Sequence, residues 1–75
     1  MDLNIYKNIY KTYQERDFYK RYRITVVTIH NVRYSDDKYT IYLDEDSIEV
    51  KDNKGTYEIF DIDIDIQYVF INEIN

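Results

Sequence analysis

The sequence predicts an α+β fold, in which an N-terminal amphipathic α-helix packs on a four- to five-stranded antiparallel β-sheet arranged as a meander. Three observations lead to this prediction. Apolar residues recur every three or four positions near the N-terminus, they alternate with polar residues further along, and Asp-rich turns separate the alternating segments. Because the chain has 75 residues and no Pro-, Gly- or Ser-rich linker, residues 1–75 are expected to form a single domain.

The predicted helix covers about residues 3–16. Its apolar residues fall on one side of a 3.6-residue repeat, and they are Leu3, Ile5, Tyr6, Ile9, Tyr10 and Tyr13. Asp2 or Asn4 is the expected cap, because a short side-chain oxygen accepts hydrogen bonds from the free N–H groups of a first turn. Beyond Gln14 the aromatic residues would fall on the polar side, so the helix is expected to end near residues 15–17.

The predicted strands cover about residues 19–34, 38–43, 47–51, 56–60 and 66–72. The first has apolar residues of both parities, which is typical of a strand covered on both faces. Turns are expected at 35–37, 44–46 and 52–55, and the last contains the only Gly, which suits a positive φ. Two interpretations remain open for residues 60–66: a continuous strand with its Asp residues on one face, or an irregular corner.

Several function classes lack their usual residues. The chain has no Cys and no Gly-rich phosphate loop, and its single His, His30, has no second His to act with. The run Asp61-x-Asp63-x-Asp65 opens like a calcium loop, but Ile66 occupies the sixth position, where Gly is needed, and Asn72 the twelfth, where Glu is needed. We therefore expect no enzyme activity, catalytic residue, metal site, cofactor or small-molecule substrate.

Residues 1–7 do not form a signal-peptide pattern, and no apolar run approaches the roughly 18 residues of a membrane span. We therefore expect a cytoplasmic protein of a bacterial or archaeal host, with no membrane partner. The composition favours Ile, Asp, Tyr, Asn, Lys and Glu, whose codons are mostly A/T-rich. It indicates a gene from a low-GC bacterium, or from a virus or mobile element that replicates in one.

The charge is unevenly distributed along the chain. Residues 1–35 carry a net charge of +4 and residues 36–75 carry −9, which gives −5 for the whole chain. An acidic surface in the second half would attract the basic, nucleic-acid-binding surface of another protein. The candidate partner-binding residues are Asp44, Glu45, Asp46, Glu49, Asp61, Asp63 and Asp65. A simpler interpretation is that these acids keep an Ile-rich sheet solvated and its edges unpaired.

If residues 61–65 formed a strand, their carboxylates would stand roughly 6.6–6.8 Å apart, in a row that imitates nucleic-acid phosphates. The function hypothesis is therefore a small acidic protein-binding inhibitor. Its sharpest form is an anti-defence protein encoded by a phage or mobile element, namely an anti-CRISPR or anti-restriction DNA mimic.

Two alternatives remain. The basic, aromatic N-terminal segment favours a nucleic-acid-binding regulator, with Lys7, Lys11, Lys20, Arg21 and Arg23 as the candidate residues. The ten Tyr residues favour a structural or assembly subunit, or a homodimer, because Tyr is common where interfaces are strongest. They are equally suited to filling a small core.

Overall fold

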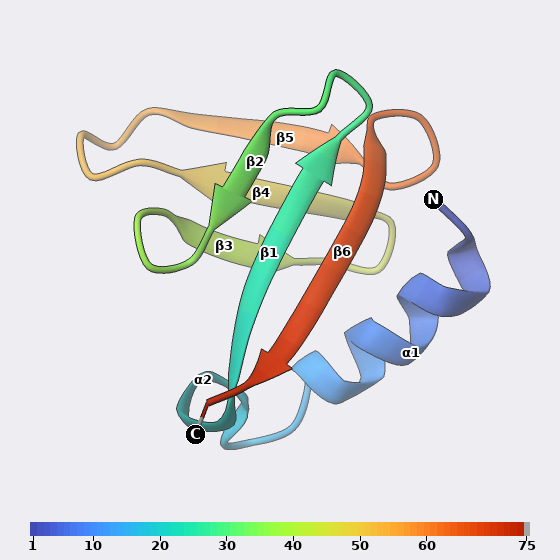
Figure 1. Cartoon of the computed structure of the whole chain (residues 1–75), viewed down its shortest axis with the longest axis vertical. Helices are drawn as coiled ribbons and strands as arrows, with labels where there is room; N and C mark the ends of the chain where they lie inside the picture. The colour runs from blue at the N-terminus through green and yellow to red at the C-terminus, as the bar shows by residue number, and fades with distance from the viewer. Residues whose placement is uncertain (75) are drawn as a thin grey trace.

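The computed structural model describes residues 1–74 and has an α+β fold (Figure 1). Helix α1 spans Leu3–Tyr13, and a single helical turn, α2, spans Phe18–Arg21. The strands are β1 (Tyr22–Thr28), β2 (Arg33–Ser35), β3 (Thr40–Leu43), β4 (Ser47–Lys51), β5 (Tyr57–Asp61) and β6 (Ile66–Glu73). None of the helices in residues 1–74 has the length and apolar character needed to cross a membrane.

The strands form two antiparallel sheets of three strands each, which cross one behind the other (Figure 1). The first sheet has the order β2-β1-β6 and the second has the order β3-β4-β5. The expected single meander of four or five strands is therefore not what forms. After β5 the chain turns at residues 61–65 and leaves the second sheet, and β6 pairs with β1 from Tyr22↔Glu73 to Val27↔Tyr68. Strand β1 becomes central because it pairs with β2 as well.

The strand expected over residues 19–34 is broken at both ends. Its start forms α2, and its second half folds back through a turn in which Asn31 has a φ of 65°. Thr28 closes this turn, because its hydroxyl accepts from the Val32 N–H at 3.2 Å while its own N–H donates to the Val32 carbonyl at 2.9 Å. Asn tolerates the left-handed conformation better than most residues, so the chain reverses there.

Helix α1 begins where the sequence places a cap and ends earlier than expected. The Asp2 carboxylate accepts from the Asn4 and Ile5 N–H groups at 2.8 and 3.4 Å, which satisfies donors of the first turn. The helix ends at Tyr13 rather than near residue 16, because the Glu15 N–H donates to the Thr12 carbonyl in a tighter turn. The chain then turns into α2 and returns Phe18 to the core.

The core lies between the two sheets and is closed on one side by α1 and α2. Its buried members are Tyr6, Phe18, Ile24, Val26, Ile41, Leu43, Ile48, Val50, Ile62, Ile66 and Val69. Burial of each such side chain contributes about 1.5–3 kcal/mol, so these residues hold both the strands and the turns between them in place. Side chains of opposite parity lie on the outer face of each sheet, where most are exposed or half-buried and Val27, at the centre of the first sheet, is buried.

Candidate functional site

Two Asp-rich turns supply most of the candidate acids. The first, Asp44–Asp46, joins β3 to β4, and all three side chains are exposed. The Asp44 N–H donates to the Ser47 carbonyl at 2.8 Å, and the Glu45 N–H donates to the Asp44 carboxylate at 2.8 Å. Asp44 therefore holds the turn, while the carboxylates of Glu45 and Asp46 project from it and accept no hydrogen bond from residues 1–74.

The second turn, residues 61–65, is held by two of its own carboxylates. Asp61 Oδ1 accepts from the Asp63 and Ile64 N–H groups at 2.8 and 3.2 Å. Asp65 Oδ2 accepts from the Asp61 N–H at 2.9 Å, and the Asp65 N–H donates to the Asp61 carbonyl at 2.9 Å. Residues 60–66 therefore contain a corner rather than a continuous strand, and the row of carboxylates at strand spacing does not form. The physical reason is that Asp side chains compete for backbone N–H groups.

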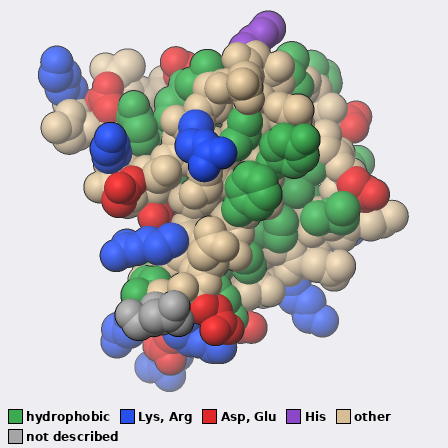
Figure 2. All heavy atoms as spheres, viewed as in Figure 1, with side chains coloured by type: hydrophobic (Ala, Val, Ile, Leu, Met, Phe, Trp, Pro, Cys, Tyr) green, Lys and Arg blue, Asp and Glu red, His purple; other side chains and the backbone are tan. Residues whose placement is uncertain are grey.

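The two turns lie side by side at one end of the second sheet. The Ile62 N–H donates to the Asp46 carbonyl at 3.0 Å, and Ser47 at the start of β4 pairs with Asp61 at the end of β5. In Figure 1 both turns are on the right, and Figure 2 shows Asp and Glu side chains along that rim. We call this group the acidic end; it consists of Asp44, Glu45, Asp46, Asp61, Asp63 and Asp65.

Glu49, the seventh candidate acid, lies outside the acidic end. It lies in β4 on the outer face of the second sheet, opposite Tyr42 and Ile59 on the neighbouring strands. Tyr42 and Ile59 are 45% and 63% exposed, so Glu49 stands in an exposed apolar row rather than among the other acids. Six of the seven candidates are thus brought together, and Glu49 flanks them on an adjoining face.

Tyr6 connects helix α1 to the acidic end. Its side chain is fully buried, and its hydroxyl donates to the Asp44 carbonyl and lies 3.4 Å from the Ser47 carbonyl. Burial, followed by the nearby Tyr10 phenol and Asp44 carboxylate, raises the pKa of Tyr6 above its usual range. The raised pKa extends to more alkaline pH the range in which the hydroxyl is protonated and donates to the turn.

No Lys or Arg among the described residues forms an ion pair with an acid of the acidic end. Within residues 1–74 the one ion pair joins Arg21 and Glu15, at 3.2 Å. Lys7 borders a groove of about 350 Å³ with Glu45 and Asp46 but forms no ion pair with them. In the described part of the chain, no three His, Cys, Asp or Glu side chains are grouped so that they could hold a metal ion.

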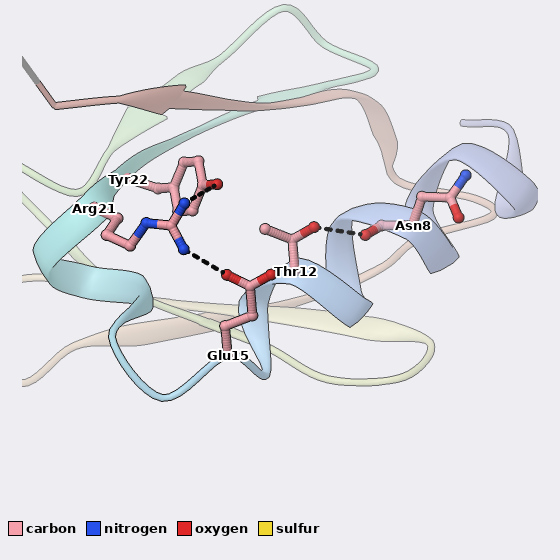
Figure 3. Close-up of polar contacts among 5 residues, drawn as sticks. All are labelled: Asn8, Thr12, Glu15, Arg21 and Tyr22. Atoms are coloured by element: carbon pink, nitrogen blue, oxygen red, sulfur yellow. Dashed lines mark hydrogen bonds and ion pairs between the residues drawn. The ribbon is translucent and has the colours of Figure 1, made fainter.

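The alternative, basic candidates are spread over several elements. Lys7 and Lys11 lie on the exposed side of α1, Lys20 and Arg21 are in α2, and Arg23 is on the outer face of the first sheet. Figure 3 shows that Arg21 is already engaged: its guanidinium contacts Glu15 and the Tyr22 hydroxyl and lies 5.2 Å from the centroid of the Tyr22 ring. The same view shows the Thr12 hydroxyl donating to the Asn8 carbonyl at 3.2 Å.

His30 lies in the exposed turn between β1 and β2. It borders a groove of about 150 Å³ whose lining includes Tyr34, Glu58 and Asp65. No hydrogen bond within residues 1–74 joins the His30 ring to any of these groups. In the part of the chain that the structure describes, His30 therefore has carboxylates beside it in the groove but no hydrogen bond to them.

Sequence reasoning missed a second exposed surface, on the outer face of the first sheet. It contains Tyr68 and Phe70 on β6, with Arg33 on β2. The available signal was that Tyr68 and Phe70 are two residues apart and so share one face of a strand. Arg33 lies on the same face because β1 pairs with both β2 and β6. This long-range pairing cannot be recognised from the local sequence.

No protein-family model, no curated protein and no solved structure matches the chain. The function proposed below is accordingly based on the residues and contacts of this molecule alone.

Proposed function

We propose that the protein is a small, acidic, protein-binding inhibitor whose acidic end occupies the basic, nucleic-acid-binding cleft of another protein. Its most specific form is an anti-defence protein of a phage or mobile element, either an anti-CRISPR or an anti-restriction DNA mimic. The observation that supports this proposal is the contact between the two Asp-rich turns, which gathers six carboxylates with no Lys or Arg paired to them in residues 1–74.

The hydrogen bonds within the turns divide the acids into two roles. Asp44, Asp61 and Asp65 accept backbone N–H groups and thereby fix the shape of the acidic end. Glu45, Asp46 and Asp63 are exposed and make no such bond, so they are the side chains available to a partner's Lys and Arg. Turns held in one conformation lose less entropy on binding, which favours affinity.

The field of the acidic end would act at two stages of binding. Clustered charge of one sign accelerates encounter with a surface of the opposite sign, and this effect weakens as salt is added. At contact, carboxylates accept charge-assisted hydrogen bonds from guanidinium groups in the way that phosphates do. The proposed partner is therefore a protein whose cleft normally holds DNA or RNA, and it would be blocked by one copy of the inhibitor.

The test uses two variants that remove the same charge from different places. The contact variant carries Glu45→Gln, Asp46→Asn and Asp63→Asn, which leaves the carboxylates that hold the turns intact. The matched control carries Asp17→Asn, Asp37→Asn and Glu73→Gln, which are exposed acids outside the acidic end. Each protein is immobilised and incubated with lysate of a low-GC bacterium.

We expect the wild type and the control to retain the same nucleic-acid-binding protein, and the contact variant to retain at least tenfold less of it. In a gel-shift assay, one equivalent of the wild type should also release DNA or RNA from the retained protein. Equal retention by the contact variant would remove the support for the acidic end as the binding site.

A structural or assembly subunit remains the second candidate, and a homodimer belongs with it. It is favoured by the exposed apolar row on the outer face of the second sheet, where Tyr42, Tyr57 and Ile59 are 45%, 58% and 63% exposed. Light scattering over a concentration series tests it, because an assembly subunit would increase in mass with concentration, whereas the proposed inhibitor would keep one mass until its partner is added.

A further inference from the structure

The outer face of the first sheet presents aromatic and basic side chains in a regular grid. The register places Arg33, Val27 and Tyr68 in one row across β2, β1 and β6, and Ser35, Thr25 and Phe70 in the next. Arg23 and Asn72 follow in a third row. Figure 2 looks onto this face and shows hydrophobic side chains over β6 and the adjoining part of β1, with a Lys or Arg side chain beside them toward β2.

Tyr68 and Phe70 form a stacked pair that is open to solvent. Their ring centroids are 5.7 Å apart, with an angle of 26° between the ring planes. The side chains are 49% and 43% exposed, although most large apolar residues on the inner face of the same sheet are buried. Each ring therefore exposes an apolar surface to water in the unbound protein. The free energy that this exposure costs is recovered when a flat group stacks on the ring.

The charged side chains that the three strands present on this face are Arg23 and Arg33, since their remaining outward residues are Thr25, Val27, Ser35, Tyr68, Phe70 and Asn72. Beside the sheet, Asp2 lines a groove with Tyr68 and Phe70, and its carboxylate accepts N–H groups of the first turn of α1. Neither Arg forms an ion pair with any carboxylate in residues 1–74. Neighbouring strands lie about 4.8 Å apart, so the two arginines are within reach of a backbone that passes along the aromatic pair.

We propose that this face binds single-stranded nucleic acid, with bases stacking on Tyr68 and Phe70 and phosphates bound by Arg23 and Arg33. Aromatic rings hold bases of any sequence because every base has a flat π face, and arginines hold the phosphates. A duplex keeps its bases stacked on one another and so cannot use the rings. This site shares no residue with the acidic end, and so it does not depend on the proposed inhibitor function.

The net charge of −5 does not prevent such binding, because the charge is not spread evenly. The molecule measures 32 × 29 × 18 Å, whereas electrostatic interactions in physiological salt are screened over about 8 Å. A phosphate beside Arg33 therefore responds mainly to nearby charges. The acidic end lies at the rim of the molecule, in turns outside the grid.

The test is fluorescence anisotropy of the full chain with fluorescein-labelled single strands of 15 thymidines or 15 uridines. The ring variant carries Tyr68→Leu and Phe70→Leu, which keeps apolar bulk but removes the π faces. Its matched control carries Tyr42→Leu and Tyr57→Leu on the outer face of the second sheet. We expect the ring variant to weaken binding about tenfold or more and the control to leave it unchanged.

The charge variant, Arg23→Gln with Arg33→Gln, tests the phosphate contacts without touching the rings or the core. Loss of two phosphate contacts from a single strand should lower the slope of log affinity against log salt by about 1.4. Its control, Arg16→Gln with Lys38→Gln, removes two exposed cations from elsewhere on the surface and should leave the slope unchanged. Because all four positions are exposed, each variant is expected to fold, which circular dichroism verifies.

Three results would overturn the proposal: no saturable binding up to about 1 mM protein, an affinity for a 15-base-pair duplex equal to that for the single strand, or equal binding by the ring variant and its control.

The contact variant of the acidic end distinguishes this proposal from the proposed inhibitor function. It should lose the protein partner while binding the oligonucleotides at least as tightly as the wild type, since it removes negative charge.

Discussion

The acidic end and the outer face of the first sheet differ in what already holds their side chains. At the acidic end, half of the carboxylates accept backbone N–H groups and serve as part of the turns. On the first sheet, the strands are held by backbone pairing and by core side chains on the inner face, and the side chains of Tyr68, Phe70 and Arg33 form no hydrogen bond or ion pair within residues 1–74. An acidic residue in a turn is therefore not necessarily available to a partner, because its carboxylate can be bonded to the backbone of the turn. An outward side chain on a strand is more often available, because the strand pairs through its backbone.

The largest expected effect on stability concerns Ile62, whose buried side chain holds the turn at residues 61–65 to the core. Ile62 is fully buried among the core residues, while Ile64 in the same turn is 66% exposed. Ile62→Ala should lower the free energy of unfolding by about 2–5 kcal/mol, because it removes buried methyl groups and leaves a cavity. For a small domain this is a large fraction of the total stability, and urea unfolding followed by circular dichroism measures it.

Ile64→Ala is the matched control for Ile62→Ala, since it makes the same chemical change two residues away in the same turn. We expect a change within about 0.5 kcal/mol, because an exposed side chain loses little contact on truncation. Equal destabilisation by the two variants would contradict the assignment of Ile62 as the anchor of the turn.

The next effect concerns the carboxylate that closes the corner. Asp61→Ala should destabilise the protein by about 0.5–2 kcal/mol, because the Asp63 and Ile64 N–H groups lose the oxygen that accepts them. Asp61→Asn keeps an acceptor oxygen and should restore most of this loss while removing the charge. Thermal unfolding of the two variants separates the structural role of Asp61 from its charge, and identical melting temperatures would show that the hydrogen bonds contribute nothing.

Elements with a local cause could be predicted from the sequence. The Asp2 cap, the apolar side of α1 and the turn containing Gly55, which has a φ of 88°, follow from short patterns. The division into two sheets could not be predicted, because the paired residues of β1 and β6 are 38 to 51 positions apart in the sequence and a register shift beside Val27 disrupts the alternation. A meander is the simplest topology for successive hairpins, and long-range pairing overrode it.

The candidate site divides in the same way. The sequence indicated which acids belong to turns, and the structure brings the Asp44–Asp46 turn against the corner at residues 61–65. Nothing in the sequence indicated that the carboxylates of Asp61 and Asp65 accept N–H groups of their own turn rather than point outward in a row. Such bonds depend on the corner conformation, for which two interpretations were open.

Tyr6 provides a third, smaller effect, because it holds the acidic end to the helix. Tyr6→Phe keeps the ring in the core and removes the hydroxyl that donates to the Asp44 carbonyl, which should cost about 1 kcal/mol. Urea unfolding at pH 7 measures this loss. An unchanged stability would mean that the turn holds its position without the helix.

The same hydroxyl predicts how stability depends on alkaline pH. Burial raises the pKa of Tyr6, Tyr19 and Tyr34 in the folded protein above the value of about 10 expected in the unfolded chain. Below about pH 10 both states keep these protons, and above it the unfolded state loses them first, so stability falls as pH rises. Tyr6→Phe should make this fall shallower than in the wild type, measured by urea unfolding between pH 9 and about 11. An equally steep fall would contradict the role of Tyr6.

The smallest effect distinguishes Arg21 from the arginines of the first sheet. Arg21 pairs with Glu15 at 3.2 Å, and the two side chains are 56% and 48% exposed, so the pair is largely hydrated. Arg21→Gln should change the free energy of unfolding by less than about 0.5 kcal/mol, because exposed ion pairs contribute little.

Arg21→Gln should also leave the affinity for single-stranded oligonucleotides unchanged, because the Arg21 guanidinium already contacts Glu15 and Tyr22. Arg33→Gln should weaken that affinity. If Arg21→Gln weakens oligonucleotide binding as much as Arg33→Gln does, the nucleic-acid surface extends from the first sheet onto α2, and the earlier assignment to the N-terminal basic segment regains support.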